Sequence, residues 1–158
     1  MSRAIALASL PVEVQAKLRK AGGSGSPFIA ATIIVPFDAL CPDNEKYGAR
    51  CIKTPQGKFR AAMFLSSRYR TAKDRLEHTA RTAMHGQRPA AGPVRLTVQC
   101  WFPDLRKRDM LNYAKVLCDS LKGVAFLDDS QIVVADWMLR GIDSEAARMI
   151  VGVTLHHE

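Results

Sequence analysis

The stretch VRLTVQCWF, residues 94–102, decides the fold of this chain of 158 residues. Apolar side chains at positions 94, 96, 98 and 100 alternate with polar ones at positions 95, 97 and 99. A period of two residues predicts a β-strand with one buried face. The order of the elements on either side of this strand then sets the fold class.

Upstream of this strand, the chain predicts a strand, a long loop and a helix. Residues 28–35 are rich in Ile, Ala and Val and are followed by a proline, which is typical of a buried strand. Residues 36–65 contain Pro, Gly, Asn and Asp with little periodicity, which predicts a long loop with a short hairpin around residues 54–57. A serine at position 66 or 67 can cap a helix that runs to about residue 84.

Downstream, the chain predicts one helix and two strands. The helix covers residues 110–122, with Gly123 placed to end it. Residues 132–139 and 147–156 are expected to form two strands of a hairpin whose turn is residues 140–145. We therefore expect an α/β (α+β) fold, in which a single domain holds a mixed sheet and two main helices.

The first 27 residues are expected to stand apart from this domain. Pro11 begins a short amphipathic segment, and residues 22–27 are rich in Gly and Ser, which predicts a flexible linker. The domain itself would span residues 28–158. The four cysteines lie at no zinc or redox spacing, and no apolar run has the length of a membrane span or the form of a signal peptide. These features favour a cytoplasmic protein with free thiols.

The formal net charge of +8 favours an acidic partner, and nucleic acid is the commonest one. The helix over residues 66–84 is basic, and the loop before it adds further cations. A basic helix face is usually only solvated. Here the excess of cations favours contacts with DNA phosphates, and the candidates on the helix are Arg68, Arg70 and Lys73.

A polar cluster follows directly after the cation run formed by Arg106, Lys107 and Arg108. At 100° per residue, one side of the helix over 110–122 is polar and the other is an apolar stripe that includes Leu111. The polar side carries Asp109, Asn112, Lys115 and Asp119.

Asp128 and Asp129 follow in the next loop. Each acidic residue also has an ordinary interpretation: Asp109 as a helix cap, Asp119 as the partner of Lys115 in a surface ion pair, and the Asp128-Asp129 pair as part of a turn. Together they favour a different interpretation, because carboxylates beside a phosphate-binding surface repel the phosphate unless a divalent cation bridges the two. This layout is typical of a metal-dependent nuclease.

Residues 103–115, 118–121 and 127–133 together resemble the RusA-type Holliday-junction resolvases, small dimeric endonucleases common in phage and prophage genomes. The family pattern is Arg-Asp-x-x-Asn-x-x-Lys-x-x-x-Asp, followed by Asp-Asp-x-Gln-Val. The resemblance implies a homodimer that cuts four-way DNA junctions by paired nicks in recombination and repair, inside a bacterial or phage-infected cell.

The resemblance also implies roles for single residues. Asp109, Asp128 and Asp129 would hold Mg²⁺, for which Mn²⁺ could substitute, and Lys115 would contact the scissile phosphate or stabilise developing charge. Arg106, Lys107, Arg108 and Asn112 would contact the DNA, and Asp119 would support the site.

Leu111 departs from the family pattern, because the best-studied type of the family has an aspartate at this position. One carboxylate fewer implies a weaker or differently built metal site. The alternative is therefore a catalytically weakened or inactive family member that binds branched DNA, and a nuclease for other branched or flapped DNA also stays open. A small-molecule enzyme is disfavoured, because the sequence has no Gly-rich phosphate loop and no nucleophile motif.

Overall fold

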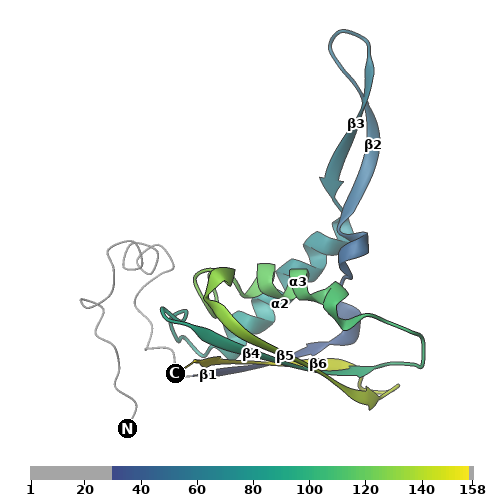
Figure 1. Cartoon of the computed structure of the whole chain (residues 1–158). Helices are drawn as coiled ribbons and strands as arrows, with labels where there is room; N and C mark the ends of the chain where they lie inside the picture. The colour runs from purple at the N-terminus through teal and green to yellow at the C-terminus, as the bar shows by residue number, and fades with distance from the viewer. Residues whose placement is uncertain (1–29, 157–158) are drawn as a thin grey trace.

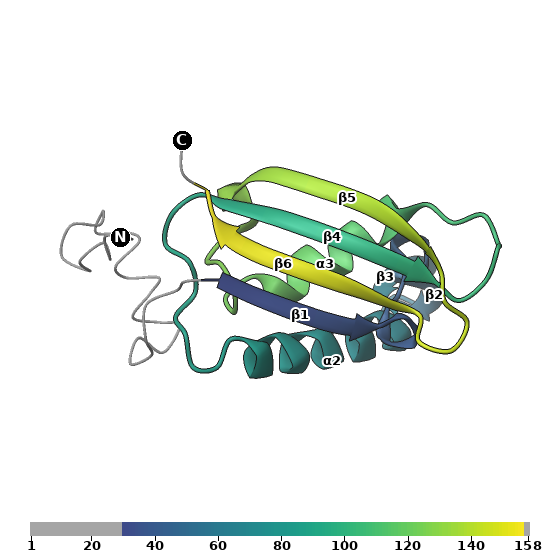
Figure 2. The same cartoon turned by 90° about the horizontal axis from the view of Figure 1, so that it is seen from below.

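The computed structural model describes residues 30–156, so the predicted extension over residues 1–27 lies outside the described residues. One sheet forms the body of the domain, with the strand order β1-β6-β4-β5 (Figure 2). Strand β4 is parallel to β5 and antiparallel to β6, so the expected mixed sheet is confirmed. Its strands are β1 Ala30–Pro36, β4 Val94–Phe102, β5 Ile132–Ile142 and β6 Arg148–Leu155.

Two helices, α2 Ser67–Ala83 and α3 Ala114–Leu121, cover one face of this sheet (Figure 1). The predicted alternation of β4 is confirmed, because its four apolar positions are buried against the helices. Helix α2 begins where the sequence predicts, since the Ser66 hydroxyl accepts a hydrogen bond from the amide of Tyr69 at 3.1 Å. None of the helices within residues 30–156 is long and apolar enough to cross a membrane.

Residues 36–65 are not the long loop that the sequence predicts. Most of them form a hairpin, β2 Tyr47–Lys53 and β3 Phe59–Leu65, which projects away from the body (Figure 1). We call it the arm. The turn lies at residues 54–58, as expected, with the amide of Gly57 donating to the carbonyl of Thr54 at 2.9 Å. Periodicity failed to reveal the strands because apolar residues occur on both faces of the arm.

The predicted hairpin of the last two strands is also wrong. The strands β5 and β6 exist, but β4 lies between them. The chain leaves β4, passes through α3 and returns as β5, which runs parallel to β4. Such a crossover is how parallel neighbours are joined. Strands β5 and β6 therefore each pair with β4 and not with each other.

The predicted helix over residues 110–122 is shorter than expected, because it begins with a 3₁₀ turn, η4 Met110–Tyr113, and continues as α3. A 3₁₀ turn advances by about 120° per residue, so a stripe calculated at 100° per residue is displaced there. Leu111 is 58% exposed and does not belong to the apolar stripe, whereas Tyr113 is buried. Gly123 ends the helix with φ of 77°, as predicted.

Candidate active site

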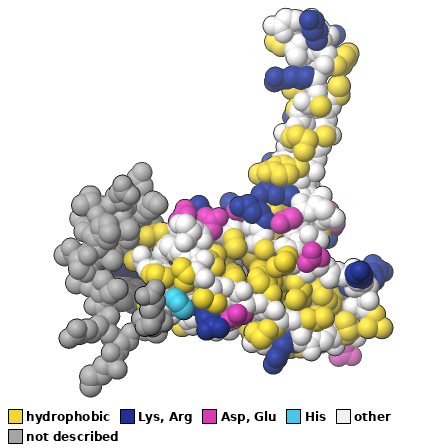
Figure 3. Space-filling model, viewed as in Figure 1, with side chains coloured by type: hydrophobic (Ala, Val, Ile, Leu, Met, Phe, Trp, Pro, Cys, Tyr) yellow, Lys and Arg dark blue, Asp and Glu magenta, His cyan; other side chains and the backbone are white. Residues whose placement is uncertain are grey.

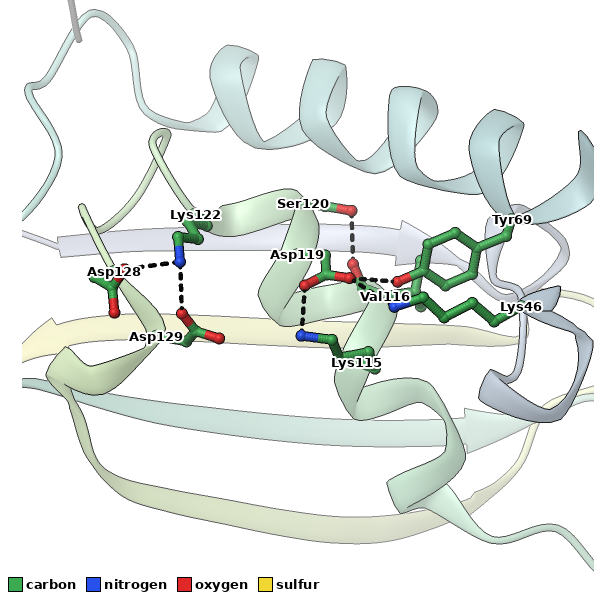
Figure 4. Close-up of polar contacts among 9 residues, drawn as sticks. All are labelled: Lys46, Tyr69, Lys115, Val116, Asp119, Ser120, Lys122, Asp128 and Asp129. Atoms are coloured by element: carbon green, nitrogen blue, oxygen red, sulfur yellow. Dashed lines mark hydrogen bonds and ion pairs between the residues drawn. The ribbon is translucent and has the colours of Figure 1, made fainter. Parts of the chain in front are cut away.

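Asp119, on the outer side of α3, binds three other side chains (Figure 4). Its Oδ2 atom accepts hydrogen bonds from the Tyr69 hydroxyl at 2.7 Å and from the Lys46 ammonium at 3.2 Å. Its Oδ1 atom lies 2.8 Å from Nζ of Lys115, one helical turn earlier. These partners come from α2, from the segment before β2 and from α3, so one carboxylate joins three parts of the fold.

The charge state of this network is fixed by its contacts. Burial alone would raise the pKa of Asp119, but the hydrogen bonds from Lys115, Tyr69 and Lys46 outweigh it and lower the pKa to about 2. The hydrogen bond to Asp119 raises the pKa of Lys115, and burial raises that of Tyr69. Asp119 is therefore a carboxylate and Lys115 an ammonium throughout the physiological range.

Sequence reasoning missed two members of this region, Tyr69 and Asp43, and assigned Lys46 only to a basic loop. Asp43 lies in η3 Asp43–Glu45, where burial raises the pKa of its carboxyl. Its Oδ1 atom is buried without a hydrogen-bond partner among the described residues. Tyr69 is 50 positions from Asp119 in the chain, and only the packing of α2 against α3 brings them together.

Asp128 and Asp129 share one lysine, Lys122, which follows α3 (Figure 4). Nζ of Lys122 lies 2.7 Å from Oδ2 of Asp128 and 2.9 Å from Oδ1 of Asp129. The hydrogen bonds to Asp128 and Asp129 raise the pKa of Lys122, and its ammonium in turn lowers the pKa of both carboxyls. Two adjacent carboxylates thus enclose a single positive charge at the surface.

Gln131 fixes the loop that carries this pair. Its side-chain oxygen accepts hydrogen bonds from the amides of Leu127 and Asp128, at 2.8 and 2.9 Å, and its nitrogen donates to the carbonyls of Ala90 and Gly92. Together with Asp128, whose carboxylate accepts from the amide of Ser130, it forms a capping box on η5 Asp129–Gln131. The Asp-Asp-x-Gln pattern therefore has a structural reason: the glutamine holds both aspartates in place.

The donor set of this pair fits a hard divalent cation. Carboxylate oxygens are the ligands that Mg²⁺ prefers, and Mg²⁺ is commonly held by one or two carboxylates together with waters and phosphate oxygens. The Lys122 ammonium shows that the two side chains can face one cation at hydrogen-bonding distance. No group of three or more His, Cys, Asp or Glu side chains in a metal-binding arrangement occurs within residues 30–156, so Asp109 does not join the pair there.

Asp109 instead caps η4, as its ordinary interpretation predicts. Its Oδ1 atom accepts a hydrogen bond from the amide of Leu111 at 2.9 Å, and its side chain is exposed. Asn112 is also exposed on the same turn. The structure therefore brings Lys115 and Asp119 together and Asp128 and Asp129 together, whereas Asp109 contacts the amide of Leu111 on its own turn.

The three cations before Asp109 differ in what they contact. Arg108 is only 17% exposed, since its guanidinium pairs with Asp104 and lies over the rings of Phe37 and Phe102. Arg106 is 83% exposed, and Lys107 is exposed as well. Arg106 and Lys107 are thus available to a ligand, whereas Arg108 holds the loop to the body.

The candidate DNA-contacting cations on α2 also differ in what they contact. Arg68 pairs with Glu45, and Arg70 is exposed without a contact that fixes its head group in the described residues. Lys73 is half-buried. In Figure 3, charged side chains of both signs form a row along the upper edge of the body, beside the base of the arm.

Comparison with known proteins agrees with this geometry. The family model described as endodeoxyribonuclease RusA matches residues 14–154, which is most of the chain and includes both acidic groups. No curated protein matches the chain. Because the match covers far more than half of the sequence, the chain belongs to the RusA family of Holliday-junction endodeoxyribonucleases.

Proposed function

We propose that this chain is a Mg²⁺-dependent endonuclease that resolves four-way DNA junctions by paired nicks, acting as a homodimer in the cytoplasm of a bacterial or phage-infected cell. The observation that carries the proposal is the Asp128-Asp129 pair, held by Gln131 and facing one cation, within a chain that belongs to a nuclease family. Its exposure leaves the pair accessible to a DNA phosphate.

Asp128 and Asp129 are the proposed metal ligands, and Asp109 is proposed to complete the site once DNA is bound. Mg²⁺, or Mn²⁺ in its place, would supply positive charge at the scissile phosphate and would lower the pKa of the attacking water. The chain's own residues hold the carboxylates in position. Lys122 offsets part of the negative charge of the pair and reduces the repulsion between the two carboxylates.

Lys115 is the proposed catalytic cation. Its side chain is 47% exposed, and Asp119 orients its ammonium by accepting a hydrogen bond at 2.8 Å. Asp119 is itself held by Tyr69 and Lys46, so the position of Lys115 depends on two further elements of the fold. An ammonium fixed in advance stabilises negative charge that develops on the phosphate at little cost in reorganisation. Asp119 therefore acts as a positioning residue.

Arg106, Lys107, Arg70 and Asn112 are proposed to contact the DNA, because their side chains are exposed. Arg68, Lys73 and Arg108 are restricted by ion pairs or burial, and we propose that they shape the surface around those contacts. Binding through phosphates carries no sequence information and becomes weaker as the salt concentration rises. This behaviour suits an enzyme that recognises the shape of a junction.

The proposal is tested with the full chain and a synthetic four-way junction, in Mg²⁺ and in EDTA, beside linear duplex and a flap. We expect symmetric nicks in the junction only when Mg²⁺ is present. Asp109→Asn should keep junction binding and lose cleavage. Cleavage in EDTA, or an Asp109→Asn variant that cuts normally in Mg²⁺, would overturn the metal assignment.

A second candidate is a catalytically weakened member of the family that binds branched DNA, and two observations favour it. Leu111 stands where the best-studied type of the family has an aspartate and is 58% exposed, so it does not contribute to the core. Asp109 forms no metal-binding group with two other carboxylates within residues 30–156. The Leu111→Asp variant separates the two candidates, because a large gain of cleavage on junction DNA is expected only if the natural site is weakened.

A further inference from the structure

The arm has one face that is almost wholly apolar. In the register of β2 and β3, Tyr47 lies opposite Leu65, Ala49 opposite Met63, Cys51 opposite Ala61 and Lys53 opposite Phe59, and these pairs alternate with the pairs on the other side. Opposed residues of an antiparallel pair point to the same face. Seven of the eight side chains on this face are therefore apolar, and we call it the apolar arm face.

This face is exposed along its whole length. Phe59 is 70% exposed, Met63 68% and Tyr47 55%. Within residues 30–156 the two arm strands pair only with each other, and the arm points away from the body (Figures 1 and 3). An isolated two-stranded hairpin is marginally stable in water. Exposed apolar patches larger than a few hundred Å² are typical of interaction sites.

The opposite face of the arm is partly covered by the arm's own side chains, and Phe64 on it is 40% exposed. The guanidinium of Arg50 lies over the ring of Phe64 at 5.5 Å. The same ring lies over Gly48, where an added Cβ would come within 2.6 Å of it, so that a larger residue would displace the ring. On the apolar arm face, the Lys46 ammonium lies 5.4 Å from the centre of the Tyr47 ring. Ala49, Phe59 and Met63 stay exposed, so most of this face is open to another surface.

The body carries a second apolar strip that is left open. Ala135, Trp137 and Leu139 of β5 are in register with the buried residues Leu96, Val98 and Cys100 of β4, so they point to the helix side of the sheet. Helix α2 lies beside β1, and α3 lies behind β6 and β4 (Figure 2). Trp137 packs partly against the core, but the strip on β5 stays open on either side of it, with Leu139 57% exposed and Ala135 exposed as well.

We infer that the apolar arm face of one chain packs on the β5 strip of a second copy, and that the arrangement is reciprocal. A two-fold axis produces such a pair, because the contact of arm with strip is repeated in the opposite direction. This inference deepens the proposed homodimer and rests on it, since it names the surfaces that join the two chains.

The size and charge of the apolar arm face and the β5 strip fit a second copy of this chain better than another partner. Seven-residue strands span about 23 Å, which the eleven-residue β5 can accommodate. Each arm face offers on the order of 400 Å², so two arms on two strips bury roughly 1,600 Å² in all, as a stable interface requires. Residues 47–65 contain four cations and no acidic residue, whereas Asp128 and Asp129 directly precede β5. The partner's arm would thus bring cations beside the acidic pair.

The first test compares two adjacent Ala→Glu substitutions by sedimentation of the full chain. Ala61 points to the apolar arm face and Ala62 to the opposite face. We expect the wild type and Ala62→Glu to sediment with twice the mass of one chain, and Ala61→Glu with the mass of a single chain. Circular dichroism checks that the variants are folded, and Met63→Gln replaces Ala61→Glu if the latter is not. A monomeric wild type, or a dimer that survives both apolar-face substitutions, overturns the inference.

The second test places a cysteine in the β5 strip. Cys51 lies on the apolar arm face and is exposed. Leu139→Cys should therefore give a covalent dimer with a short bis-maleimide, and adding Cys51→Ser should abolish it. A wild-type dimer cross-linked through Cys51 alone would show that the arms pack on each other and would overturn the strip as the acceptor. Neither test measures cleavage, so an inactive protein can still support the inference, and an active monomer would still overturn it.

Discussion

Asp119 and the Asp128-Asp129 pair lie near the same helix but differ in how their charge is satisfied. Asp119 accepts from three donors that come from three parts of the fold, and its side chain is 22% exposed. Asp128 and Asp129 share one lysine at the surface and are 33% and 41% exposed. A carboxylate with all of its partners in the protein stabilises the fold, whereas a pair that shares one cation can exchange that cation for a ligand.

Asp129→Asn should separate these roles most strongly. If Asp129 holds the cation in the proposed reaction, its loss removes several kcal/mol of charge stabilisation, so cleavage should fall by more than about 100-fold. The thermal midpoint should hardly change, because the side chain is exposed. The measurement is the rate of junction cleavage in Mg²⁺, with the thermal midpoint measured beside it. A variant that is inactive only because it has unfolded would contradict the division between the two groups.

Asp119→Asn should show the reverse pattern, with a clear effect on stability. The pKa of Asp119 falls from 3.8 to about 2 on folding, which corresponds to about 2 kcal/mol of stability at neutral pH. Urea unfolding at pH 7 measures the change in the free energy of unfolding. The matched control is Asp43→Asn on η3, where burial raises the pKa of the carboxyl, so that removing the charge should cost nothing or stabilise the protein. Equal losses from both substitutions would contradict this assignment.

The pH dependence of stability sharpens the same point. Because the folded pKa of Asp119 lies below its ordinary value, its contribution is fully present above about pH 4 to 5 and is lost as the pH falls towards 2. The free energy of unfolding should therefore decrease over this interval in the wild type. The decrease should be smaller in Asp119→Asn. Parallel curves for the two proteins would show that other carboxyls dominate the acid transition.

Local pattern was enough to predict the parts of the fold that depend on neighbouring residues. The alternation of β4, the Ser66 cap of α2 and the ending of α3 at Gly123 were all predicted from short stretches and are confirmed. The pairing of β5 with β4 and the length of the arm were not predicted. Strand partners depend on contacts far along the chain, and an exposed hairpin with apolar residues on both faces has no single period.

In the candidate site, too, contacts between residues close in the sequence could be predicted, whereas contacts between distant segments could not. The ion pair of Lys115 with Asp119 follows from helical spacing, and the turn at Asp128-Asp129 follows from its residue types. The partners Tyr69 and Lys46 come from segments far from the motif, so no local signal connects them with Asp119. The exposure of Leu111 was missed because η4 is a 3₁₀ turn, and a helix of constant pitch places that side chain wrongly.

The smallest expected effect concerns two arginines in one loop. Arg106 and Arg108 allow the same comparison between an exposed charged residue and one that is held by the fold. Arg106 is 83% exposed, whereas Arg108 is 17% exposed, pairs with Asp104 and lies over two aromatic rings. If Arg106 contacts a phosphate, Arg106→Ala should reduce the slope of log affinity against log salt by about 1 without changing stability. Arg108→Ala should lower stability, because it removes the close ion pair with Asp104 and the packing on the rings, and it should leave the salt slope almost unchanged. Junction binding measured in EDTA over a range of salt concentrations gives both slopes, and equal slopes for the two variants would show that exposure in the free protein does not identify the residues that touch DNA.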